Sequence, residues 1–238
     1  MKRAIIIGAS SGIGRELAKV LSQDGYSVGI TGRRVELLTS LQQELPAPSF
    51  IRRMDVSQTS EAIQLLDELI REMGGVDLVV ISAGVGFINS ELEWEKERAI
   101  IDTNVGGFAA VANVAVKQFI QQSSGHLVGI SSIAALRGSG ATPAYNASKA
   151  FMSNYMEGLR QKVSKLKLPI IVTDVQPGLV DTAMAQGEGL FWVAPTEKAA
   201  RQIFNTIKNR RKHAYVTKRW RGIAWLLKVV PDSVYNKM

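Results

Sequence analysis

The chain has 238 residues, 46% apolar and 21% charged, a balance that excludes a disordered protein and favours one globular domain. Without cysteine it has no disulfide, thiol nucleophile or thiolate metal site, which fits the reducing cytoplasm, where we expect the protein. The net charge of +8 is uneven: ten basic residues and one acid lie from Arg201 onward, so the other 200 residues carry −1. His126 and His213 share no ligand spacing, and we expect no metal site.

Short apolar runs alternate with longer segments of helical periodicity. Because the first run is too short for a signal-peptide core, it is better used as a strand. No run approaches the roughly 18 to 20 apolar residues that span a bilayer. We expect strands at Ala4–Ile7, Ser27–Thr31, Ser49–Arg53, Leu78–Ser82, Gly125–Ile130 and Ile170–Val175, and helices that include Gly14–Asp24, Ser60–Met73 and Ala144–Lys165.

This alternation predicts the α/β class: a single Rossmann-like, doubly wound domain, with a parallel sheet covered by helices on both faces. The sequence has no internal repeat and no clear linker, so we do not divide it into separate domains. Residues 1–217 form the predicted domain, and residues 218–238 form a basic, apolar tail that packs on it or extends from it.

A glycine-rich turn follows the first predicted strand. Gly8, Gly12 and Gly14 have the spacing G-x-x-x-G-x-G, and a helical segment begins directly after them. Glycines allow a tight turn and let backbone N–H groups approach a pyrophosphate at a helix N-terminus. A strand before the turn and a helix after it favour a dinucleotide site over a plain connection.

The residues after the second predicted strand indicate the type of dinucleotide. NAD-binding folds place a carboxylate there for the ribose 2′-hydroxyl, but this chain has Arg33 and Arg34. An arginine binds a 2′-phosphate through its planar fork, whereas a carboxylate would repel it. We therefore predict NADP(H), with Arg33 as the first choice of phosphate ligand and Arg34 as the second. The alternative for Arg34 is that it points to solvent.

Tyr145 and Lys149 form a Tyr-x-x-x-Lys pair, with Ser132 thirteen positions before the tyrosine. Residues i and i+4 share one helix face. A nearby ammonium favours the phenolate and lowers the tyrosine pKa from about 10, which suits proton exchange with an oxygen during hydride transfer. Taken alone, the pair is a weak motif, and an ordinary exposed helix face is then the better interpretation.

In this order, these motifs resemble the short-chain dehydrogenase/reductase family from Ala4 to about Thr217. The family pattern also matches Asp55-Val56, Ser82-Ala83-Gly84, Asn104 and the segment from Pro177 to Thr182. The resemblance implies that NADP is bound by Gly8, Ser10, Ser11, Gly12, Ile13, Gly14, Arg33, Arg34, Asp55, Val56, Ala83, Gly84, Tyr145, Lys149, Pro177, Gly178, Val180 and Thr182.

The resemblance further implies hydride transfer between NADP(H) and the carbonyl or alcohol carbon of a mostly apolar small molecule. Tyr145 would act as acid and base, Lys149 would lower its pKa and hold the nicotinamide ribose, and Ser132 would bind the substrate oxygen. Asn104 would hold a water next to Lys149. The alternatives are that Asn104 satisfies buried backbone groups and that Ser132 caps a turn. By the same resemblance we expect a homodimer or homotetramer, paired through the helices that carry Asn104 and Tyr145.

Residues of about 183–194 correspond to the family's substrate flap. Gly187 and Gly189 could act as hinges, and the apolar side chains could line a pocket or simply pack. The predicted substrate contacts are Met184, Leu190, Phe191 and Trp192, together with Val85, Phe87, Leu136 and Arg137, the last of which could read an acidic substrate.

The tail reads as a short helix with basic residues at its start, ended by Pro231. We favour packing on a partner subunit or over the substrate entrance. Two alternatives stay open: residues 218–231 lie on an anionic membrane, or they cap the domain's own core. Nucleic-acid binding is not expected, because no recognition motif accompanies the charge. The alternative functions are a non-catalytic NADP-binding sensor or scaffold and a membrane-peripheral reductase of a lipid-like carbonyl.

Overall fold

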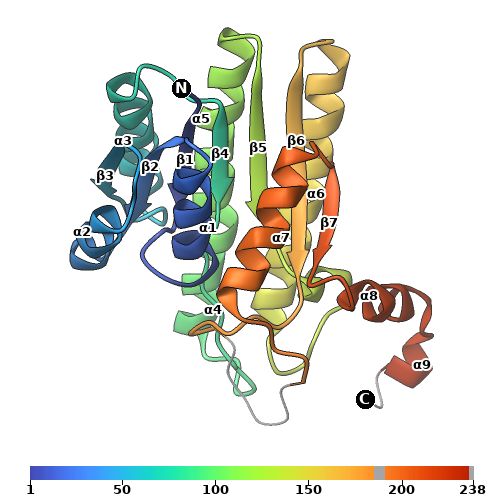
Figure 1. Cartoon of the computed structure of the whole chain (residues 1–238). Coiled ribbons are helices and arrows are strands. Elements are labelled where there is room, and N and C mark those ends of the chain that lie inside the picture. The colour runs from blue at the N-terminus through green and yellow to red at the C-terminus, as the bar shows by residue number, and fades with distance from the viewer. Residues whose placement is uncertain (185–190, 236–238) are drawn as a thin grey trace.

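Seven parallel strands form one sheet in the computed structural model, which describes residues 1–184 and 191–235. Their spatial order is β3-β2-β1-β4-β5-β6-β7 (Figure 1). The strands are β1 (Arg3–Ile7), β2 (Ser27–Gly32), β3 (Ser49–Arg53), β4 (Leu78–Ile81), β5 (Gly125–Ile130), β6 (Ile170–Pro177) and β7 (His213–Val216).

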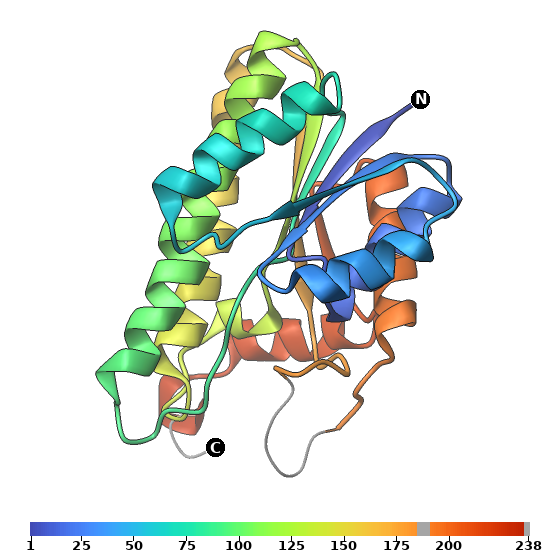
Figure 2. The ribbon, with the colours of Figure 1, turned by 90° about the vertical axis from the view of Figure 1, so that its left-hand side faces the viewer.

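Helices cover both faces of this sheet. Figure 2 shows α3, α5 and α6 on one face and α1, α2 and α7 on the other, with α8 lying across the end of the sheet. The helices are α1 (Gly12–Gln23), α2 (Val35–Gln43), α3 (Thr59–Glu72), α4 (Trp94–Ile100), η1 (Ile101–Gly107), α5 (Phe108–Gln121), η2 (Ile133–Leu136), α6 (Pro143–Lys165), α7 (Thr196–Lys208), α8 (Trp220–Val229) and α9 (Asp232–Tyr235).

The alternation of side chains along β1 explains the two layers. Ile5 and Ile7 belong to the core under α3, α5 and α6, whereas Ala4 and Ile6 belong to the core under α1, α2 and α7. All four are buried, as expected for a strand covered on both faces. The predicted α/β fold is therefore confirmed.

The predicted strands and helices agree with the structure to within two residues at each end. The sequence analysis missed β7, which pairs with β6 at the edge of the sheet. This strand has only four residues and directly follows Arg210, Arg211 and Lys212, so its sequence lacks the apolar run that marked the other strands.

The expectation that no segment is long and apolar enough to cross a membrane is wrong, because one helical segment meets both criteria by its length and composition. The continuous helical segment Trp94–Gln121 has 28 residues and an apolar window of mean hydropathy 1.4, half of which is buried inside the fold. Phe108, Val111 and Phe119 of this segment lie in the core against the sheet. Its apolar character thus has a use within the domain, because a helix that covers a sheet must be apolar on the covered side.

Candidate active site

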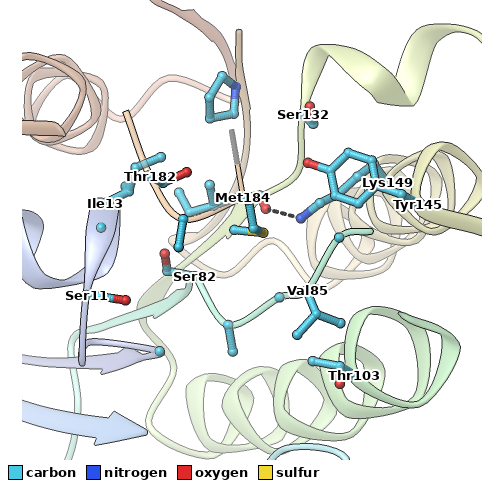
Figure 3. Close-up of a pocket in the computed structure, with 18 of the residues that line it drawn as sticks. Ser11, Ile13, Ser82, Val85, Thr103, Ser132, Tyr145, Lys149, Thr182 and Met184 are labelled. Atoms are coloured by element: carbon cyan, nitrogen blue, oxygen red, sulfur yellow. Dashed lines mark hydrogen bonds between the residues drawn. The ribbon is translucent and has the colours of Figure 1, made fainter. Parts of the chain in front are cut away.

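A cavity of about 620 Å³ opens at the carboxyl ends of the strands. β1 and β4 are neighbours in the sheet, but the chain leaves β1 toward one face of the sheet and β4 toward the other. The segments after these two strands therefore part and leave a crevice, the usual ligand site of such sheets. Figure 3 shows that side chains from both halves of the chain point into it, with Ser11 and Ile13 on one side and Tyr145 and Lys149 on the other.

The glycine loop forms one wall of this cavity. Gly8 has a φ of +91°, and a Cβ there would lie 2.5 Å from the Ala83 backbone nitrogen, so only glycine lets the two segments approach. A Cβ on Gly14 would collide with the Gly8 carbonyl oxygen. Gly14 therefore allows close contact between α1 and the turn, and it does not itself line the cavity.

The N-terminus of α1 is electrostatically open toward the cavity. Ser11 precedes the helix without a side-chain capping bond, and the first turn of α1, which is fully described, holds no acidic residue. Gly12 and Ile13 line the cavity. The free N–H groups and the positive end of the helix dipole are therefore available to an anion such as a pyrophosphate.

Both predicted phosphate ligands line the same cavity and are exposed. The Arg34 guanidinium donates hydrogen bonds to the hydroxyls of Ser10 (3.0 Å) and Ser11 (2.7 Å), so it lies on the glycine loop and does not simply point to solvent. Asp55 lies behind β3, where its carboxylate accepts bonds from the Ser57 N–H (3.0 Å) and hydroxyl (2.8 Å). This end of the cavity thus combines two guanidinium groups with one carboxylate.

The predicted catalytic side chains meet at the other end. Ser132 follows β5, and Tyr145 and Lys149 lie one turn apart near the start of α6 (Figure 3). The Lys149 ammonium is buried, donates a bond to the Ile130 carbonyl oxygen (3.1 Å) and lies 5.7 Å from the centre of the Tyr145 ring. The Ser132 hydroxyl accepts a bond from the Ala134 N–H (3.1 Å), so this serine caps η2 as well as facing the cavity.

The pKa of Tyr145 differs from the sequence expectation. Burial raises it, and a hydrogen bond with the Ser132 hydroxyl offsets part of that rise. This direction is opposite to the expected lowering by the Lys149 ammonium, which in this structure is directed at the Ile130 carbonyl oxygen. Burial also lowers the pKa of Lys149 to about 8, against the opposing effect of the negative charge on Asp174.

Asn104 lies in η1, a π-helical segment between α4 and α5. Its side-chain oxygen accepts a bond from the Val85 N–H (2.9 Å), and its amide donates to the Val85 carbonyl (2.8 Å) and the Ser148 hydroxyl (3.0 Å). Asn104 does not line the cavity and matches the alternative in which it satisfies buried backbone groups. It holds the segment after β4 in place, and a Cβ on Gly84 there would lie 3.4 Å from the Lys149 ammonium.

Two parts of the site were missed from the sequence. Gly86 lines the cavity, and a Cβ there would lie 2.9 Å from the Tyr145 ring. Asp174 is buried on β6, where its carboxylate accepts bonds from the Ser131 hydroxyl (2.5 Å) and the Gln176 amide (3.2 Å). An acid inside an otherwise apolar strand run is the signal that could have identified it.

The remaining cofactor candidates all line the cavity: Val56, Ala83, Gly84, Pro177, Gly178, Val180 and Thr182. Of the predicted substrate contacts, Val85, Phe87 and Met184 line it as well. Leu136 and Arg137 are not part of its wall in the described chain. Gly187, Gly189 and Leu190 lie outside the described residues.

Arg137 is not available to an acidic substrate, because it holds the tail. Its guanidinium donates to the carbonyl oxygens of Leu227 (3.4 Å) and Val230 (3.0 Å) at the end of α8 and pairs with Asp232 (2.7 Å). It also lies 4.2 Å from the centre of the Tyr235 ring. These contacts satisfy the last carbonyls of the helix and fix the tail to the loop that precedes α6.

The start of α8 packs beside the cavity. Trp220 is buried, and a Cβ on Gly178 would collide with its ring. Phe191 stacks on Trp220 with ring centres 5.3 Å apart, and Trp192 meets it edge-on at 6.5 Å. Phe191 and Trp192 are about half exposed and do not line the described cavity, so here they cover the tail and not a substrate.

Comparison with known proteins identifies the class that this fold and site define. Residues 2–190 match the family model of the short chain dehydrogenases. An uncharacterized oxidoreductase of Myxococcus xanthus is 40% identical over 188 residues, covering 77% of this chain and 74% of the relative. One from Staphylococcus epidermidis is 32% identical, covering 78% and 81%.

Two solved structures share the fold. A short-chain dehydrogenase from Streptomyces avermitilis has a TM-score of 0.84 at 24% identity and covers 99% of this chain and 94% of that one. An alcohol dehydrogenase from Thermococcus sibiricus, solved with 5-hydroxy-NADP, has a TM-score of 0.79 at 22% identity, covering 91% and 96%. The chain belongs to the short-chain dehydrogenase family. It is an oxidoreductase of that family, whose members use a nicotinamide cofactor.

Proposed function

We propose that this protein is an NADP(H)-dependent reductase of a mostly apolar small carbonyl compound, or a dehydrogenase of the matching alcohol. The observation that carries the proposal is the convergence of the Ser132 hydroxyl, the Tyr145 hydroxyl and the Lys149 ammonium in one cavity that begins at an open helix N-terminus. The proposed location is the cytoplasm.

The described residues fit a nicotinamide dinucleotide phosphate. The open end of α1 suits the pyrophosphate, and Arg33 and Arg34 at the mouth suit a 2′-phosphate, since a guanidinium pairs with phosphate bidentately. Asp55, held by Ser57, would contact the adenine. When bound, the nicotinamide supplies or accepts the hydride.

The protein's own groups would handle the substrate oxygen. Because burial keeps the Tyr145 phenol protonated at neutral pH, Tyr145 is suited to donate its proton to the alkoxide formed on reduction. The Ser132 hydroxyl would hydrogen-bond the same oxygen and stabilise its developing charge. Lys149 would hold the nicotinamide ribose and replace the proton lost by Tyr145, and Asn104 would keep the segment after β4 against that lysine.

The predicted substrate contacts that line the cavity are apolar. Val85, Phe87 and Met184 line it, and Arg137 is already bonded to the tail. These contacts favour an uncharged, apolar carbonyl compound over an acid. We also propose a homodimer or homotetramer paired through α5 and α6. A monomeric mass at micromolar concentration in solution would contradict this assembly.

The test is oxidation of NADPH, followed by absorbance, against a panel of aldehydes, ketones and diketones, with NADH in parallel. We expect turnover that prefers NADPH. Arg33→Gln should raise the KM for NADPH and leave that for NADH nearly unchanged. Loss of affinity for both cofactors alike would refute the role of Arg33.

Tyr145→Phe separates the reductase from the runner-up function, a non-catalytic NADP-binding sensor. The variant should bind NADPH but lose turnover, whereas Tyr155→Phe, ten residues further along α6 and outside the cavity, should retain it. A wild-type protein that binds NADPH but reduces nothing, in a panel extended to long-chain carbonyls, would favour the sensor.

A further inference from the structure

The C-terminal third of the chain carries a long run of exposed positive charge. From Lys198 to Pro231 there is no aspartate or glutamate, and all ten basic residues of this run are exposed. In the described part of the chain only Lys208 forms an ion pair, with Asp24 at 3.9 Å. The ten are Lys198, Arg201, Lys208, Arg210, Arg211, Lys212, Lys218, Arg219, Arg221 and Lys228.

Three of these cations line one groove. Arg211, Lys218 and Arg221 meet between the end of α7, β7 and the start of α8, around a hollow of about 670 Å³. The rest of its described wall holds amides, hydroxyls, aromatic rings and apolar side chains, with no carboxylate: Gln202, Asn205, Thr206, Asn209, His213, Ala214, Tyr215 and Val216. This composition suits an anionic group such as a phosphate.

α8 is apolar on two faces, and only one of them is used by the domain. Trp220 and Ala224 point inward and are buried. On the outer face Trp225 is 68% exposed, Leu226 48% and Val229 53%. These three residues follow helical spacing, and Arg221 and Lys228 lie on the same side at i−4 and i+3 from Trp225. The outer apolar residues therefore contribute little to the core.

We propose that Arg211, Lys218, Arg221, Trp225, Leu226, Lys228 and Val229 form a docking surface for an anionic phospholipid bilayer, here called the tail surface. The cations would contact headgroup phosphates, and the tryptophan, leucine and valine would enter the interfacial layer, as in helices that lie flat on membranes. A nucleic acid would use the cations but gain little from this exposed apolar row, so the combination favours lipid.

Docking would also determine what reaches the active site, an extension that rests on the proposed function. α8 lies at the carboxyl end of the sheet, where the cavity opens (Figure 1). Phe191 and Trp192, packed on Trp220, expose further aromatic surface beside it. With the tail surface on a bilayer, the cavity entrance would lie near the lipid. The substrate class is then a carbonyl compound dissolved in the membrane.

The experiment is sedimentation of the whole protein with sucrose-loaded vesicles of phosphatidylcholine, with and without phosphatidylglycerol. We expect binding only to the anionic vesicles. Trp225→Ser with Leu226→Ser should weaken vesicle binding by about tenfold or more, because the variant lacks two apolar side chains that would enter the bilayer. The matched control is Ile63→Ser with Leu166→Ser, two apolar side chains exposed elsewhere, and it should bind like the wild type.

Charge is tested in the same way. Arg221→Gln with Lys228→Gln should weaken binding to anionic vesicles, whereas Lys162→Gln with Lys165→Gln, at the far end of α6, should not. Equal sedimentation with neutral and anionic vesicles, or no sedimentation with either, would overturn the proposal. So would unchanged binding of the Trp225/Leu226 variant with displacement by duplex DNA, since the surface would then be a general anion site.

The readout is independent of turnover. A Trp225/Leu226 variant that loses vesicle binding but keeps turnover of a water-soluble aldehyde supports the tail surface. Vesicle binding by a protein without turnover would support the tail surface and contradict the proposed reductase function. Point substitutions are preferred to removal of residues 219–238, because removal would also take away Trp220, which packs against Gly178.

Discussion

Replacing Asp174 by asparagine isolates one charge behind the active site. The side chain is 2% exposed, and its two oxygens accept bonds from Ser131 and Gln176. Asparagine has the same shape and can still accept the bond from Ser131, so the change removes charge with little change of volume. Its main target is Lys149, whose pKa Asp174 raises against the stronger effect of burial.

The size of the effect follows from the pKa of Lys149, which burial brings from 10.5 to about 8 even with Asp174 present. That difference corresponds to about 3 kcal/mol against the charged form. Without the carboxylate the pKa falls further. A further fall of about one unit would reduce the protonated fraction of Lys149 at pH 7 from roughly nine-tenths to about half.

The assay is the pH dependence of kcat/KM with NADPH, which reports ionisations of the free enzyme. We expect loss of the lysine charge to produce the alkaline decline, and in Asp174→Asn this decline should move to lower pH by about one unit or more. Ser131→Ala, which removes a partner but keeps the carboxylate, should move it much less. A folded Asp174→Asn protein with the wild-type profile would refute the electrostatic role of Asp174.

Three further predictions concern His126, Gly86 and Arg137. Burial lowers the pKa of His126 to about 4, so its neutral form is favoured in the folded state and stability is lost as pH falls from about 6.5 toward about 4. The free energy of unfolding in urea should fall between pH 7 and pH 5 by about 2 kcal/mol more in the wild type than in His126→Gln. An equal fall in the two proteins would contradict this. Gly86→Ala should displace the Tyr145 ring and lower kcat by about tenfold or more at nearly unchanged NADPH affinity, a result that an unaltered kcat would exclude. Arg137→Met should lower the free energy of local opening of the tail by about 2 kcal/mol, seen as roughly thirtyfold faster tryptic cleavage in α8. Unchanged cleavage would show that this arginine does not hold the tail.

The sequence predicted what depends on local spacing. Gly8 and Gly12 lie where a strand passes into a helix, and Tyr145 and Lys149 are one turn apart, so neighbouring residues alone fixed their placement. The pKa of Tyr145 was predicted wrongly, because it depends on burial by segments far away in the chain and on which acceptor the lysine reaches. Asp174 was missed for the same reason: its effect on Lys149 depends on the pairing of β5 with β6.

Arg137 shows a different limit. Its position after Ser132 suggested contact with substrate, but its partners are 90 to 95 residues further along the chain. No local pattern connects a loop arginine with the carbonyls at the end of a distant helix. The short tail helix with basic residues at its start was easier to predict, since those residues and its tryptophans are adjacent in the sequence.

The short connection between β7 and α8 determines how the tail is held. Three residues separate Val216 from Trp220, so the tail is tethered beside its binding site at an effective concentration in the millimolar range or above. Weak contacts are then sufficient, and the packing of the tail on its own domain does not depend on the protein concentration. Cleavage after Pro231 would remove Asp232 and Tyr235, two partners of Arg137, and leave its bonds to the carbonyl oxygens of Leu227 and Val230. Loss of the residues after Pro231 would therefore weaken the hold of the tail on the loop before α6 without ending it.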